Sequence, residues 1–230
     1  MAVLMIGHSD PPLSGKDYFS ENSWEEIILA CQTNKVPDTW VIGDSKPMTI
    51  NGVEYKVLVI GKKHDSYADG TGLAPLTFQM FECYTTPYRM NGNDTNAGGW
   101  EYCQMRTSHI PTILSLMPGA VQSALREVSK LTTGGSRSST IVTTADKLFL
   151  LSEMETYGVA SNSTVAEGIQ YEYYRKGYST AKKVAGANSI CWLRSPYKGN
   201  SNAFCCIDNG GGASYYNSSN SAGVSLAFCF

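Results

Sequence analysis

The last 34 residues of the chain, Tyr197–Phe230, are drawn from a smaller set of amino acids than the 196 residues before them. Lys, Glu, Gln, Met and Trp supply 40 residues of the sequence, and an even spread would place about six of them in this segment. Only Lys198 is present. The remaining residues are mainly Asn, Ser, Gly, Tyr, Ala, Cys and Phe. This composition is typical either of a disordered tail or of loops held on a rigid scaffold.

Apolar residues in the segment favour the scaffolded alternative, because a disordered tail would not need them. They recur at spacings that can anchor strands. The residues concerned are Phe204, Ile207, Val224, Leu226, Phe228 and Phe230.

The polar residues of the segment resemble those of an antibody paratope. Tyr provides rigid amphipathic contact area there, while Ser, Gly and Asn provide adaptable hydrogen bonds. The same set of residues arises when the adenines of an AAC codon are randomised, because codons of that form never encode Lys, Glu, Gln, Met or Trp. The segment therefore predicts a diversified binding surface.

The expected ligand contacts are the tyrosines and small polar residues of this segment. Phe204 and Cys206 are further candidates if the face of their strand that carries them points to solvent. Trp192, Val224 and Phe228 are expected to belong to the scaffold. The full set of candidate ligand-binding residues is Tyr197, Asn200, Asn202, Phe204, Cys206, Asn209, Tyr215, Tyr216, Asn217, Ser218, Asn220 and Ser221.

Length and composition limit the classes of protein that fit. A chain of 230 residues with 42% apolar residues can bury a substantial core and indicates a folded globular protein. A net charge of −2 provides no basic field for nucleic acid or an anionic membrane. The apolar runs are too short for membrane insertion, and no signal peptide is recognisable, so we expect synthesis in the cytoplasm. Seven Cys without CxxC spacing predict reduced thiols.

The order of predicted elements indicates a mixed α+β fold without the rhythm of a parallel sheet. Residues 1–21 are predicted to be a leader or linker remnant, and residues 22–230 one domain. Asn22-Ser23 is expected to cap a helix, and Asn51-Gly52 to join two strands in a hairpin. Helices are expected within Ile110–Leu131. The expected strands include Trp40–Ile42, Met48–Ile50, Tyr55–Ile60, Phe78–Tyr84, Ile190–Leu193, Ala203–Asp208 and Val224–Phe230. Asp146–Glu155 is expected to be mostly a buried strand, or the end of a short helix that runs into one.

The end of the chain resembles a known signature. Trp192-Leu193-Arg194-Ser195-Pro196, a variable stretch and then Gly223-Val224-x-x-Ala227-Phe228 resemble the C-terminal part of variable proteins from diversity-generating retroelements. More broadly, the chain is similar to a phage and bacterial domain family of unknown function with the same ending. Ser225-Leu226 departs from the Arg-Pro usual in the family. Further blocks extend the resemblance over residues 22–230: Trp40–Asp44, Gly61–Asp65, Gly98–Trp100, Met105-Arg106 and Asp146–Glu155.

The resemblance implies a C-type-lectin-like fold in which a retroelement rewrites a variable region at about residues 197–230. It also implies a non-enzymatic ligand- or receptor-binding protein, either at the tail tip of a phage virion or on a bacterial cell surface. The partner would be a variable protein or a cell-surface ligand, and both a monomer and a trimer are compatible. The alternative is a structural or assembly domain of a phage tail or cell-surface protein with a fixed partner.

Charged residues outside the tail are interpreted as braces of the fold. Arg194 lies in a strand expected to be buried, so its guanidinium needs a carboxylate partner. Glu153 and Glu155 are the candidates because alternation places them on one face of their expected strand. This bracing ion pair is favoured over the acid/base pair of a glycoside hydrolase. The pair His64-Asp65 is likewise expected to form a turn or to brace the fold.

No catalytic residue, metal site or cofactor is predicted. Sugar-binding C-type lectins use the triplets E-P-N, Q-P-D and W-N-D, and none of them occurs in the sequence. Calcium-dependent sugar recognition is therefore not expected. Asp65 and Asp69 stay open as ligands of a structural ion.

Overall fold

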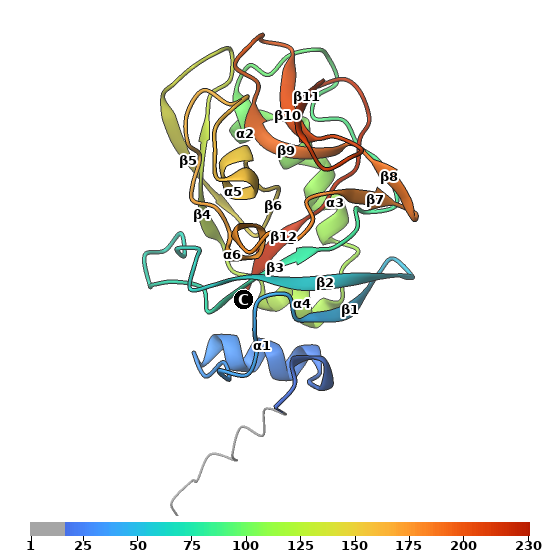
Figure 1. Ribbon diagram of the computed structural model, residues 1–230. Coiled ribbons are helices and arrows are strands. Elements are labelled where there is room, and N and C mark those ends of the chain that lie inside the picture. The colour runs from blue at the N-terminus through green and yellow to red at the C-terminus, as the bar shows by residue number, and fades with distance from the viewer. Residues whose placement is uncertain (1–16) are drawn as a thin grey trace, which may run out of the picture.

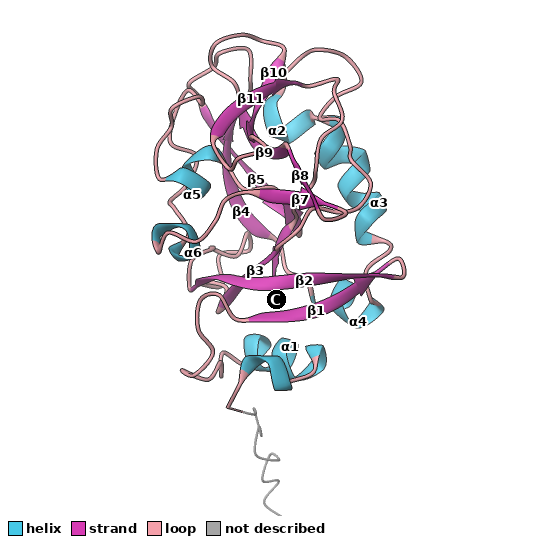
Figure 2. Cartoon of the chain, turned by 45° about the vertical axis from the view of Figure 1, so that its right-hand side comes forward, coloured by secondary structure: helices cyan, strands magenta, loops and turns pink. Residues whose placement is uncertain are grey.

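The computed structural model describes residues 17–230 and has a mixed α+β fold (Figures 1 and 2). All strand pairs in this range are antiparallel. None of the helices described has the length and apolar character that crossing a bilayer requires. The helices are η1 (Phe19–Glu21), α1 (Trp24–Gln32), α2 (Gly99–Tyr102), η2 (Met105–His109), α3 (Ile110–Leu114), α4 (Gly119–Ala124), α5 (Glu153–Tyr157) and α6 (Glu172–Arg175).

The strands form four sheets, with the orders β1-β2-β3-β12-β6, β11-β10-β9, β4-β5 and β7-β8. Figure 1 places β10 and β11 at the opposite end of the molecule from α1. The strands are β1 (Ser45–Ile50), β2 (Val53–Lys62), β3 (Leu76–Met80), β4 (Val128–Thr133), β5 (Ile141–Asp146), β6 (Leu148–Phe149), β7 (Lys182–Val184), β8 (Ala187–Ser189), β9 (Cys191–Pro196), β10 (Ala203–Ile207), β11 (Ala213–Asn217) and β12 (Ala227–Cys229).

The last strand is an interior strand of the largest sheet. β12 pairs with β3 on one side and β6 on the other, and Phe228 is opposite Phe78. The rings of Phe78, Phe228 and Phe230 pack with centroid separations of 5.3–5.5 Å. The final residues therefore complete the core, and the predicted variable segment is anchored at both of its ends.

Two local predictions near the N-terminus are confirmed. Ser23 caps α1 in a reciprocal capping box with Glu26, which satisfies donors that the first helical turn leaves unpaired. Asn51 and Gly52 join β1 to β2 with φ angles of 49° and 76°. Such left-handed angles at both central residues define the turn whose twist matches the flanking strands.

The start of the domain lies earlier than expected. Most of the predicted leader, residues 1–16, falls outside the described residues. Phe19 is buried, and its ring contacts Trp40 and Phe78 at centroid distances of 5.3 and 6.2 Å. Residues from η1 onward therefore pack with the domain, and the boundary at residue 22 is a few residues late.

Some predicted strands are wrong or too long. Trp40–Ile42 is not a strand, because Val41–Asp44 forms a turn in which the Asp44 carboxylate accepts the Val41 N–H at 2.7 Å and the Asp44 N–H donates to the Val41 carbonyl at 3.1 Å. β3 ends at Met80, and β12 is confined to Ala227–Cys229.

Other segments change their type of structure. Ile110–Leu131 contains α3 and α4 as expected, but it then enters β4, which pairs with β5. Asp146–Glu155 contains the two-residue strand β6 and the start of α5. Ser152 and Glu155 form a second capping box, which makes this segment helical where a strand was expected.

Candidate functional site

The predicted binding residues gather on the loops and the edge strand around β10. Most of them are exposed or half-buried, as expected for contact residues. We call this group the display surface and define it as Tyr197, Asn200, Asn202, Asn209, Tyr215, Tyr216, Asn217, Asn220 and Ser221.

Three predicted contact residues are wrong, because Phe204, Cys206 and Ser218 are fully buried. β10 is the central strand of its sheet, and neither of its faces is exposed to solvent. Ser218 acts as an internal brace. Its hydroxyl accepts the Thr95 N–H at 2.8 Å and lies 3.0 Å from the Asn93 carbonyl oxygen.

Aromatic side chains form the rigid part of the display surface. The rings of Tyr197 and Tyr215 stack at a centroid distance of 3.8 Å and an interplanar angle of 7°. Tyr215 is 47% exposed, so this stack presents a flat face to solvent. Tyr216 leans on the buried scaffold residue Trp192 at 5.8 Å. Rings fixed in this way give contact area with little further loss of conformational entropy.

The Asn96 side chain holds the loop between β9 and β10 by binding main-chain groups of that loop. This side chain is fully buried, and its amide nitrogen lies within hydrogen-bonding distance of the carbonyl oxygens of Ala203 (2.8 Å), Asn200 (3.1 Å) and Tyr197 (3.3 Å). Its amide oxygen accepts the Ser136 N–H at 2.8 Å. None of these contacts involves a side chain of the variable segment.

The same pattern occurs at other points of the segment. The Arg137 guanidinium donates to the Gly199 carbonyl at 2.9 Å. Tyr157 and Thr180 donate their hydroxyls to the Gly211 carbonyl at 2.9 and 2.6 Å. Because these scaffold side chains bind carbonyl groups, they can hold the loops in place whichever side chains the loops carry.

A buried ionic cluster joins β9 to α5 and β4. Arg194 forms a two-pronged ion pair with Glu155, which also contacts Lys130 at 2.6 Å. Burial alone would raise the pKa of Glu155, but the positive charges of Arg194 and Lys130 outweigh it and hold the pKa below its usual value. The predicted bracing pair between Arg194 and Glu155 is therefore confirmed.

Glu153 has a different structural role from the one predicted. Its carboxylate accepts the main-chain N–H groups of Asn162 and Ser163 at 2.7–2.9 Å. The Asn162 carbonyl in turn accepts the Lys198 N–H at 2.8 Å. Glu153 and Glu155 lie in the first turn of α5, and the interactions of Glu153 leave Glu155 as the acidic partner of Arg194.

Asp65 is a brace, as expected for the pair His64-Asp65. Its carboxylate binds Lys130 at 2.7 Å, Thr77 at 2.5 Å and the Tyr171 hydroxyl at 2.9 Å. The His64 ring stacks on Tyr171 at 3.9 Å. The carboxylate oxygens of Asp65 are thus taken up by the protein itself.

Asp69 lies apart from this cluster. It accepts hydrogen bonds from Thr71 and Arg126. In residues 17–230, no three His, Cys, Asp or Glu side chains come together as a possible metal site. The seven cysteines are all buried, and the structure pairs none of them in a disulfide.

Glu167 is a functional candidate that the sequence did not indicate. Burial raises the pKa of its carboxyl group to about 7, although Arg194 acts in the opposite direction. One oxygen lies 3.3 Å from the Thr132 hydroxyl, and the other has no hydrogen-bond partner among the described residues. A carboxyl group in this setting is close to half-ionised near neutral pH.

A comparison with known families identifies the family of the chain. Residues 76–230 match a family described as a domain of unknown function, DUF6273. The chain belongs to that family. The DUF6273 match begins at β3 and includes the whole display surface, whereas α1, β1 and β2 precede it and β2 pairs with β3. No curated protein and no solved structure matches the chain.

Proposed function

We propose that this DUF6273 protein is a non-enzymatic ligand-binding protein whose display surface is diversified by a retroelement. The observation that carries the proposal is the way in which the loops are held. Asn96, Arg137, Tyr157 and Thr180 bind main-chain carbonyls of residues 197–211, so these four contacts do not depend on which side chains the loops carry. A surface that must accept many sequences needs this separation.

The composition of the display surface supports binding by shape and side-chain complementarity. The stacked rings of Tyr197 and Tyr215 provide an aromatic anchor, and most other residues of the display surface are small and polar. Aromatic residues in this kind of setting carry much of the affinity at protein interfaces. The partner that we propose is a protein or another ligand on a cell surface.

We further propose a C-type-lectin-like arrangement and a location at a phage tail tip or on a bacterial surface. The arrangement is supported by the return of the chain after β11 to the main sheet, where β12 lies next to β3. The loop between β9 and β10 lies at the end of the molecule far from α1 (Figure 1). Ser225 and Leu226 fit this core, since the Ser225 hydroxyl donates to the Met80 carbonyl at 2.7 Å and Leu226 is buried.

A pair of libraries tests the proposal. In the first, the display surface residues are randomised together to Asn, Ser, Tyr and Gly. In the second, the same residue types replace Phe204, Cys206 and Ser218. Protease resistance of displayed variants reports the folded fraction of each library. We expect most members of the first library to fold and few members of the second, because only the second library alters buried side chains.

A domain with a fixed partner would expose the same residues, so folding alone does not distinguish it from a diversified binder. Binding is therefore measured as well. The folded members of the first library are panned against an unrelated protein, hen egg-white lysozyme. Recovery of specific binders altered only on the display surface supports a diversified binder. If the first library is mostly unfolded, the proposal is wrong.

A further inference from the structure

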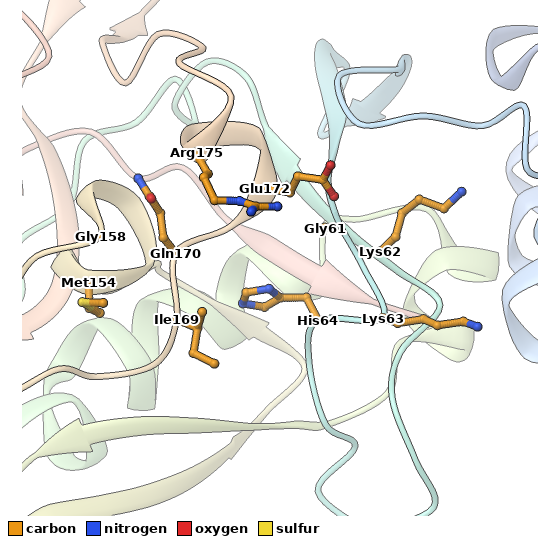
Figure 3. Close-up of a pocket in the computed structure, with 10 residues that line it drawn as sticks. All are labelled: Gly61, Lys62, Lys63, His64, Met154, Gly158, Ile169, Gln170, Glu172 and Arg175. Carbon is orange, nitrogen blue, oxygen red and sulfur yellow. The ribbon is translucent and has the colours of Figure 1, made fainter.

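A cavity of ≈ 450 Å³ opens on the surface, separate from the display surface. Its wall consists of the end of β2 with the residues after it, α5, and α6 with the loop before it. Figure 3 shows the side chains of Arg175 and His64 reaching from different elements toward the same part of the cavity. No residue of the variable segment lines this cavity, so its composition does not change with the displayed sequence.

The charges around the cavity favour an anion. The charged residues that line it are Lys62, Lys63, Arg175 and one carboxylate, that of Glu172, and Figure 3 shows the side chains of Lys62 and Lys63 extending away from Arg175 and His64. Glu172 already pairs with Lys176 at 3.1 Å, and Lys62 donates to a main-chain carbonyl at 2.8 Å. Arg175 forms no ion pair with any residue in the described part of the chain. A guanidinium in this state offers a planar fork of donors that fits a carboxylate or phosphate group.

The remaining wall is uncharged and partly apolar. Met154 is half-buried, and Ile169 is 72% exposed at the cavity. Burial lowers the pKa of His64 although Asp65 lies beside it, so the imidazole is neutral near pH 7. A site with one unpaired guanidinium, on the exposed residue Arg175, and adjacent apolar side chains suits a ligand that has both a charged and an apolar part.

The cavity wall is preformed. The His64 ring stacks on Tyr171, which is itself fully buried and bonded to Asp65. A Cβ atom added at Gly61 would lie 3.0 Å from the Cβ of His64 and 3.0 Å from the ring of Tyr171. This wall therefore has little room to collapse, and a ligand would meet an ordered site.

We propose that this cavity binds a small organic anion, with its carboxylate against Arg175 and its apolar part against Met154 and Ile169. The inference is independent of the display function, because the two surfaces share no residue. The carboxylate provides the geometric match to the guanidinium, and the apolar part gains from leaving water.

The test is a titration of the full chain with sodium acetate, butyrate, hexanoate and inorganic phosphate at constant ionic strength. Binding is followed by NMR shifts of the side-chain N–H of Arg175 and the ring of His64. We expect saturable binding that tightens from acetate to hexanoate, by about fourfold for each methylene that becomes buried. Arg175→Gln should weaken binding by about tenfold or more, since it removes a charge-assisted hydrogen bond.

The matched control is Arg89→Gln, which removes an exposed arginine that does not line the cavity. It should leave the affinity for hexanoate unchanged, and the melting temperature of each variant verifies that it is folded. The proposal fails if wild-type protein shows no saturable binding, or if Arg175→Gln binds as well as wild type. Equal affinity for phosphate and hexanoate would also overturn it, because the apolar wall would then contribute nothing.

Discussion

Asn96 allows the separation of scaffold and display roles to be measured with one type of substitution. Asn96→Ala removes the side chain that holds the loop after β9, whereas Asn209→Ala removes an exposed asparagine of the display surface. Both changes delete the same atoms. They differ only in whether those atoms carry hydrogen bonds to the protein.

The expected cost follows from the hydrogen bonds lost. The amide group of Asn96 has two hydrogens, shared among three carbonyl oxygens at 2.8–3.3 Å, and its oxygen accepts one more bond at 2.8 Å. About three effective bonds at roughly 1 kcal/mol each, plus the penalty for partners left buried and unpaired, give about 3 to 5 kcal/mol. Asn209→Ala should change stability by no more than about 0.5 kcal/mol, as is usual for exposed sites.

The assay is equilibrium unfolding in urea of the two variants and the wild type, followed by tryptophan fluorescence. Hydrogen exchange of the Tyr197 amide, which donates to the Ala203 carbonyl at 3.0 Å, shows whether the loop itself opens. Comparable losses of stability in the two variants would refute the reasoning. So would an Asn96→Ala variant that loses less than about 1 kcal/mol.

Three further predictions concern buried residues of the scaffold and one exposed residue of the display surface. Because burial raises the pKa of Glu167 to about 7 from the 4.5 of a free side chain, the folded state holds a proton that the unfolded state has lost. The free energy of unfolding should therefore fall by up to about 3 kcal/mol as the pH rises from about 4.5 to 7, and Glu167→Gln should abolish this fall in urea titrations at a series of pH values. Arg194→Met should cost about 3 to 5 kcal/mol in the same assay at pH 7, since it leaves the Glu155 carboxylate buried beside fewer positive charges, and a cost below about 1 kcal/mol would contradict the bracing role. In calorimetry, the stability of Tyr215→Ala should stay within about 1 kcal/mol of wild type, whereas Phe204→Ala, on the neighbouring strand, should lose about 3 to 5 kcal/mol of stability. Similar losses in the two variants would contradict the contrast between an exposed Tyr215 and a buried Phe204.

Local signals predicted local structure well. The Asn51-Gly52 turn and the capping residue Ser23 act through contacts only a few residues apart, so the sequence contains all the information they need. The demand of Arg194 for a carboxylate was also predictable, because a buried guanidinium cannot stay unpaired. The partner Glu155 was right, although it comes from a helix and not from a strand.

Long-range contacts limited the predictions for the site. Alternation along β10 could not assign Phe204 or Cys206 to an outer face, because a central strand covered on both faces has no outer face. The role of Asn96 depends on carbonyl groups more than 100 residues away in sequence, and main-chain carbonyls have no sequence signature. The orphan oxygen of Glu167 likewise depends on tertiary packing alone.

The central claim is that residues on the display surface vary while the side chains that hold them do not. Deep sequencing of the 3′ end of this gene across the source population tests the claim directly. The account predicts substitutions at the adenine positions of display surface codons, an unchanged Asn96 and Arg194, and a near-identical template repeat beside a reverse transcriptase gene. An invariant 3′ end without such a cassette would contradict it and would make a domain with a fixed partner the better explanation.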